Sequence, residues 1–235
     1  MGLTRDQGVV LAKRSISLSK TYAATGTLLA CLSVFAASLT KLESGLGSGG
    51  PLFVEQSVSL ISVPFGALAA LIFTQPVLML FVYDKNNGVL EYLLSLGKDQ
   101  GDVYKQYLKA AIILSSAMVA FEAALHIAVG YALGVGSIAV FLVVGLVVAI
   151  AIPVVSFTTL AMMAFSSLQK QRAGSNQPLG LTLGSAAVVP SYVAFALGLS
   201  EGAILDVTLA ATVSALAFLM YFFSSRLIRR ENFLP

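Results

Sequence analysis

Long apolar stretches, separated by short polar segments, run through most of the chain. A helix that crosses a bilayer needs about 20 mostly apolar residues, and six segments meet this requirement. The predicted spans are Tyr22–Leu39, Val58–Tyr83, Ala110–Leu133, Ile138–Phe165, Leu179–Leu199 and Val207–Phe223. The pattern therefore predicts an all-α, polytopic membrane protein with six transmembrane helices, organised as a single transmembrane domain over residues 1–235.

Composition agrees with this interpretation and excludes several classes of protein. The chain is 57% hydrophobic and only 11% charged, whereas an average soluble domain is about 25% charged. No basic run is interleaved with aromatic residues, so nucleic-acid binding has no support. The single cysteine, Cys31, lies in an apolar stretch and is interpreted as a small buried hydrophobe. No metal-ligand spacing is present.

The distribution of basic residues predicts the orientation. With both termini in the cytoplasm, all of the 14 Lys and Arg residues except Lys41 fall on the inner side. The positive-inside rule asks for this bias in short loops. The first span follows basic residues, as a signal peptide does, but its apolar stretch is longer than a typical signal core, so we expect an uncleaved span. We therefore expect a multi-pass protein of the cell membrane.

The polar segment after the second span predicts a short amphipathic helix over Val89–Leu96. Asn86 or Asn87 is suited to cap its start, and Gly97 is suited to end it. Val89, Leu90, Leu93, Leu94 and Leu96 share one arc, and Glu91, Tyr92 and Ser95 lie on the other side. A helix this short is not stable alone, so its apolar face must be covered. This face packs on the protein's own surface, on the lipid interface or in a groove of a partner protein. The periodicity of the sequence does not distinguish among these three.

The N-terminal stretch Leu3–Lys20 is also expected to be helical. Leu3, Val10, Leu11 and Leu18 share a face of this helix, although Arg14 intrudes on it. A basic helix of this kind is typical of one that lies on the inner leaflet of a membrane.

The residues from Asp84 to Ser95 resemble a motif of the membrane subunits of ABC-2 type transporters, the ATP-binding-cassette class. An acidic-basic pair is followed by Gly88, an aliphatic pair, Glu91 and leucines. The resemblance extends to six spans, a basic N-terminal elbow helix, a polar loop at Ser166–Gln177 and a basic terminus at Arg226–Arg230.

This resemblance implies a permease that is not itself an enzyme. The Gly45–Pro51 loop is glycine-rich, but the chain lacks the lysine and serine or threonine of a P-loop. ATP and Mg²⁺ are therefore expected on a separate ATPase subunit, and a second permease subunit, identical or related, is expected to complete an exporter. The coupling helix that docks on the ATPase is expected to use Gly88, Val89, Leu90, Glu91, Leu93 and Leu94.

Two ionisable residues fall inside the third predicted span. Glu122 and His126 are four residues apart and so share a helix face. An ionisable residue at membrane depth suggests a functional site, here part of a translocation path, whereas the plainer interpretation is a buried polar pair. The alternatives to an ABC-2 permease are an intramembrane enzyme and a secondary transporter that use this pair. Neither a Gly-x-Ser-x-Gly nor a His-Glu-x-x-His motif is present to favour the enzyme.

Overall fold

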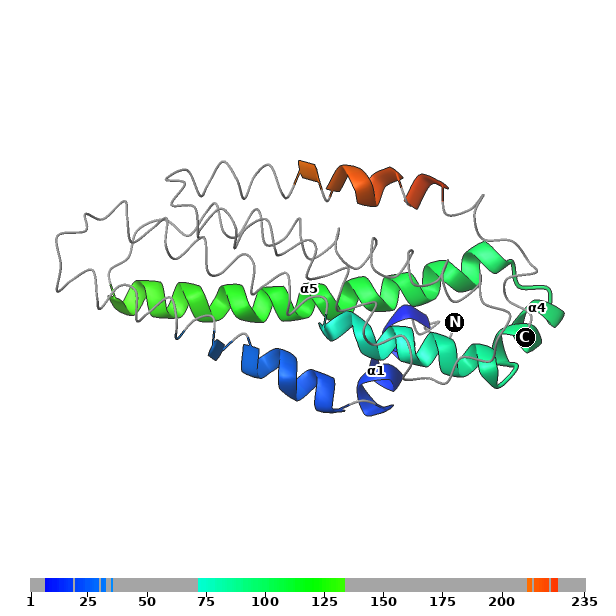
Figure 1. Cartoon of the computed structure of the whole chain (residues 1–235), viewed down its shortest axis with the longest axis horizontal. Coiled ribbons are helices and arrows are strands. Elements are labelled where there is room, and N and C mark those ends of the chain that lie inside the picture. The colour runs from blue at the N-terminus through cyan, green and yellow to red at the C-terminus, as the bar shows by residue number, and fades with distance from the viewer. Residues whose placement is uncertain are drawn as a thin grey trace, which may run out of the picture.

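A computed structural model describes residues 7–18, 20–29, 31–32, 35, 72–133, 211–212, 214–219 and 221–223. Within these ranges the chain forms helices and turns and contains no strand (Figure 1). The all-α class is thus confirmed for this part of the chain. The fourth and fifth predicted spans lie outside the described residues, as do residues 58–71 of the second span and the polar loop at 166–177.

The longest described helix is α5, Gln100–Leu133, with 34 residues. At 1.5 Å per residue it is about 51 Å long, clearly more than the roughly 30 Å of a bilayer's hydrocarbon core. Its segment Gln100–Ala128 is the one described helix that is long and apolar enough, by length and composition, to cross a membrane. This helix contains the third predicted span, but it begins at Gln100 rather than at Ala110.

The early start of α5 has a local cause in Asp99. The Asp99 side chain accepts a hydrogen bond from the backbone N–H of Gly101, with an N–O distance of 3.0 Å. Its carbonyl accepts from Asp102 and Val103, each at 3.1 Å. An aspartate at this position satisfies amide groups that the first turn of a helix leaves unpaired. The helix therefore extends well beyond the apolar segment that predicted it.

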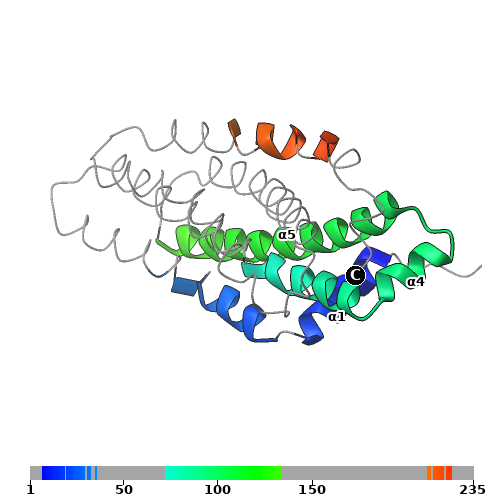
Figure 2. The ribbon, with the colours of Figure 1, turned by 45° about the vertical axis from the view of Figure 1, so that its right-hand side comes forward.

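The helix of residues 72–86 lies antiparallel to α5. Its Phe81 ring meets the Tyr107 ring edge-on, with centroids 5.1 Å apart, and its Phe73 packs against Met118 further along α5. Figure 1 and Figure 2 show the two helices side by side. Helix α4 lies beyond the N-terminal end of α5. The core cluster between and around them consists mainly of buried Val, Leu, Phe, Tyr and Ala side chains.

Helix α1, Gln7–Leu18, packs against α5, and the residues that it buries are small. Gly8, Ala12 and Ser15 are buried, while Val10 and Leu18 are 46% and 58% exposed. Val10 and Leu18 are two of the four residues predicted to share the apolar face of this helix. Small side chains let helix backbones approach closely. Leu11 and Ile16 are partly buried against the core cluster, whereas Val9, Val10 and Leu18 remain exposed.

The chain is helical again at residues 20–29, 31–32 and 35, inside the first predicted span. Leu28, Leu32 and Phe35 are exposed on this segment, and so is Cys31. The interpretation of Cys31 as a buried residue was therefore wrong. An apolar stretch does not distinguish a side chain that faces the protein from one on an outward-facing apolar surface.

Gly26 lies against Phe73 of the 72–86 helix. A β-carbon at position 26 would overlap atoms of the Phe73 ring. The absence of a side chain therefore lets Phe73 lie between residue 26 and Met118.

We expect Gly26→Ala to lower the thermal unfolding midpoint of the detergent-solubilised protein. Alanine favours a helix by about 1 kcal/mol over glycine, but overpacking typically costs about 1–3 kcal/mol. A second change, Phe73→Leu, should recover part of the loss, and Thr27→Ala on the exposed side of the same segment is the control. A more stable Gly26→Ala protein would show that the ring moves aside without cost.

Candidate functional site

The predicted short helix is present as α4, Val89–Ser95. Gly88 precedes it as the N-cap residue, with a φ of 72° and no side-chain cap. The predicted cap at Asn86 or Asn87 was wrong, because the Asn87 side chain donates instead to the carbonyl of Tyr83 at 2.8 Å. Asn87 therefore closes the preceding helix, and Gly88 supplies the left-handed backbone conformation that starts the next one.

The predicted end of α4 at Gly97 is confirmed. Gly97 has a φ of 78°, its N–H donates to the carbonyl of Leu94 at 3.0 Å, and the N–H of Lys98 donates to that of Leu93 at 3.2 Å. This pair of reverse hydrogen bonds is the usual way in which a glycine terminates a helix. Two left-handed glycines thus fix both ends of α4 and the angle at which it leaves its neighbours.

The two faces of α4 have different surroundings. Leu90 and Leu94 are 0% and 8% exposed and belong to the core cluster shared with α5, and Leu93 is partly buried against it. On the other face, Tyr92 is 61% exposed and Glu91 is also exposed. The protein's own core therefore covers Leu90 and Leu94 of the predicted apolar arc, whereas the placement of Leu96 on that arc was wrong, because Leu96 is 59% exposed.

This arrangement divides the six residues expected to dock on a partner. Leu90 and Leu94 hold α4 in place and are not accessible, whereas Glu91 is accessible. Gly88, Val89 and Leu93 are intermediate. Tyr92, Ser95 and Leu96 were outside the expected set, but they lie on the exposed side beside Glu91. We call the residues Glu91, Tyr92, Ser95 and Leu96 the outer face of α4.

A buried carboxylate lies just before α4. Asp84 is fully buried, and its two oxygens accept hydrogen bonds from two different helices. Arg14 of α1 donates through Nη2 to Oδ1 at 3.0 Å and through Nη1 to Oδ2 at 3.3 Å. The hydroxyl of Tyr107 on α5 donates to Oδ2 at 2.6 Å. We call Arg14, Asp84 and Tyr107 the carboxylate triad.

The geometry of the triad suits a buried charge. Removing a carboxylate from water costs several kcal/mol, and this cost is offset only by a well-placed counter-charge and further hydrogen bonds. The two-pronged contact of Arg14 and the short bond from Tyr107 are of the strong, charge-assisted kind. Lys85, the basic neighbour in the motif, has no place in the triad, and partial burial lowers the pKa of its ammonium group.

Sequence reasoning missed this triad. Arg14 was noted only as a charge that interrupts an apolar face of the N-terminal helix, and Asp84 only as part of a motif. A charge that interrupts an apolar pattern is itself a signal, because it favours a partner of opposite sign nearby. Asp84 is one of 11 acidic residues in the chain, so its pairing with Arg14 was not evident from the sequence.

Glu122 and His126 lie elsewhere on α5. Both are buried, at 0% and 4% exposure, and His126 Nε2 is 3.9 Å from Glu122 Oε1, too far for a hydrogen bond. Fifteen helical positions separate Tyr107 from Glu122, which is roughly 22 Å along α5. The structure therefore brings Glu122 and His126 near each other but not near the triad or α4.

Comparisons with models of known protein families, with curated protein sequences and with solved structures gave no match.

We expect Tyr107→Phe to destabilise the protein, because it removes a hydrogen bond to a buried charged group, worth about 1.5–3 kcal/mol. The loss should nearly vanish in an Asp84→Ala background, where no carboxylate is left to accept the bond. Thermal unfolding of both single variants and the double variant measures this coupling. Tyr92→Phe, which changes an exposed tyrosine, serves as the control. Additive losses from Tyr107→Phe and Asp84→Ala would show that the contact does not stabilise the fold.

Proposed function

We propose that this chain is the membrane-spanning permease subunit of an ATP-driven ABC-2 type transporter. In this proposal the outer face of α4 docks on a separate ATPase subunit. The observation that carries it is the division of α4 into a face fixed in the core and a face left open. A helix that passes on the movement of a partner must be firmly held on one side and accessible on the other.

The position of α4 supports the same function. It is connected to the 72–86 helix through residues 87–88 and to α5 through residues 96–99. Both neighbours fall within apolar segments predicted to enter the membrane, and α5 is long enough to do so. A displacement of α4 would therefore act on two membrane helices at once. The resemblance of Asp84–Ser95 to the family motif adds independent support from the sequence.

The outer face has the chemistry of a small protein interface. Tyr92 and Leu96 are large side chains that are 61% and 59% exposed, and Glu91 adds a negative charge beside them. Exposed aromatic residues with a charged rim are typical of interface hot spots. The ATPase surface opposite is expected to offer an apolar pocket with a basic group near its edge.

The remaining parts of the proposal follow the distribution of charge and the family resemblance. The chain spans the cell membrane six times with both termini in the cytoplasm, so that α1 and α4 lie on the inner side with most of the basic residues. A second permease subunit, identical or related, pairs with it around the transport path. The transporter exports its substrate, and ATP and Mg²⁺ bind only to the ATPase subunits.

We expect a P-loop ATPase to co-purify with the tagged full-length protein from its native cells in mild detergent. Tyr92→Ser combined with Leu96→Ser should remove most of the ATPase, because both side chains lie on the outer face. Quantitative mass spectrometry of the purified complex measures the ratio of the two chains. The matched control is Tyr83→Ser, which alters another exposed tyrosine, 49% exposed, outside α4.

Two results would contradict the proposal. A well-folded protein that purifies without any ATPase would argue against an ABC-2 permease. Equal loss of the ATPase in the Tyr83 variant and in the Tyr92/Leu96 variant would argue against docking through α4.

A further inference from the structure

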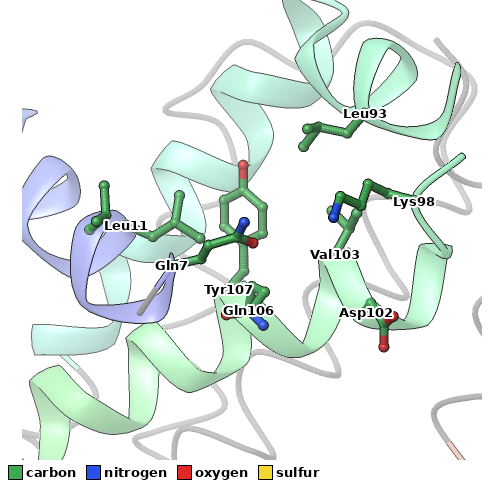
Figure 3. A pocket seen from close by; sticks show the side chains of 9 residues that line it. Gln7, Leu11, Leu93, Lys98, Asp102, Val103, Gln106 and Tyr107 are labelled. Atoms are coloured by element: carbon green, nitrogen blue, oxygen red, sulfur yellow. The ribbon is translucent and has the colours of Figure 1, made fainter. Parts of the chain in front are cut away.

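Helix α1 has one half that packs in the protein and one half that does not. Gly8, Ala12 and Ser15 are buried on the packed half, and Leu11 lies in the wall of a pocket that α1 shares with α4 and α5 (Figure 3). With 3.6 residues per turn, the exposed residues of α1 after Gly8 fall on the opposite half of the helix. We call these residues the outer half of α1; they are Val9, Val10, Lys13, Arg14, Ser17 and Leu18.

The outer half of α1 combines apolar side chains with positive charge. Val9 and Leu18 are 40% and 58% exposed. Lys13 is exposed on the same half, and Lys20 is exposed just after α1. Residues 7–20 include no aspartate or glutamate. Apolar and basic side chains on one exposed surface are the combination with which helices bind membranes that contain negatively charged lipids.

The carboxylate triad fixes the level of α1 relative to the predicted spans. Arg14 Nη2 is 3.0 Å from Asp84 Oδ1, and Asp84 directly follows the second predicted span. Tyr107, the third member, precedes the start of the third predicted span at Ala110 by three residues, which is about 4.5 Å along α5. The headgroup layer on each side of a bilayer is about 5–8 Å thick. The triad therefore holds α1 at the level of the lipid headgroups.

We propose that the outer half of α1, together with Lys20, binds anionic phospholipids of the inner leaflet. Lys13 and Lys20 contact the lipid phosphates, while Val9 and Leu18 pack on the glycerol and the start of the acyl chains. This inference rests on the membrane placement in the proposed function, but it does not depend on an ATPase partner or on transport.

The charges on this surface select among lipids and other partners. A phosphatidylcholine headgroup offers the same phosphate as phosphatidylglycerol, but its ammonium group is repelled by the lysines. The charge of Arg14 is already answered by Asp84, so the preference for anionic lipids comes from Lys13 and Lys20. An acidic protein would also attract these lysines, but a surface at headgroup level that exposes apolar side chains favours lipid.

A tryptophan introduced on the outer half tests the proposal. The chain contains no tryptophan, so Ser17→Trp gives a single reporter beside Lys13 in the full-length protein, reconstituted in phospholipid vesicles. Lipids with brominated acyl chains quench tryptophan fluorescence on contact. Mixtures of brominated phosphatidylglycerol with unlabelled phosphatidylcholine, and the reverse, give the relative binding constant of the two lipids at position 17. We expect phosphatidylglycerol to bind more tightly by about fivefold for each lysine that contacts it.

Variants identify the side chains that cause the preference. Lys13→Gln and Lys20→Gln should each lower it at position 17, and the double variant should bring the relative binding constant close to one. The matched control is Lys98→Gln, which alters an exposed lysine on the side of the pocket away from α1 (Figure 3). Lys98 precedes α5 and lies about 15 Å or more from Ala110 along that helix, so its loss should leave the preference unchanged.

A second reporter position separates this inference from the proposed function. Phe35→Trp replaces an aromatic side chain that is 61% exposed, in the segment that follows α1, and both lipids should quench it alike. Quenching at position 35 but not at position 17 would overturn lipid binding by α1 and indicate a protein partner there, while the membrane placement would stand. Absence of quenching at both positions would contradict the membrane placement itself.

Two further outcomes would overturn the inference. One is equal binding of the two lipids at position 17, and the other is an equal loss of preference in Lys13→Gln and Lys98→Gln. Thermal unfolding of each variant establishes that it is folded. Thr21→Trp, at another exposed position one turn further along the chain, replaces the reporter if Ser17→Trp does not fold. Because no ATPase enters the assay, the lipid preference and the permease proposal are tested separately.

Discussion

The described part of this protein depends on one buried negative charge. Asp84 lies at the end of the 72–86 helix and has no contact with solvent, so its carboxylate must find its partners inside the protein. Those partners come from α1 and from α5, positions 70 and 23 residues away in the chain. Because a fully buried carboxylate tolerates little displacement of its donors, the triad fixes the relative positions of three helices at one point.

Because the carboxylate triad lies just before α4 in the chain, it also contributes to holding α4 in place. The chain passes from Asp84 through the left-handed Gly88 into α4, with Leu90 and Leu94 then buried against the same core. α4 has only seven residues, and a helix of that length has little stability of its own. Its rigidity must therefore come from the triad, the two glycine-defined ends and the leucine contacts. A partner that pushed on the outer face would move this assembly as one body rather than bend α4 alone.

Local features of the structure were predictable from the sequence, and features that depend on distant residues were not. The helical character of α4 and its end at Gly97 follow from periodicity and from one residue type, and both are confirmed. Periodicity also placed Leu90 and Leu94 on one face, but it carries no information on what covers that face. The same limit explains the error at Cys31, where an apolar neighbourhood was consistent with either side of an apolar helix. Arg14 was recognised as out of place, yet its partner is 70 residues away.

The contrast between Asp84 and Glu122 shows how far burial alone indicates function. Both carboxyl groups are fully buried, but Asp84 has strong donors from two other helices, in a geometry that accounts for its charge through packing alone. His126 lies one turn further along the same helix, with its Nε2 atom 3.9 Å from Glu122 Oε1. The triad thus links the α4 end of α5 to α1 and to the 72–86 helix, and this role follows from its contacts rather than from burial alone.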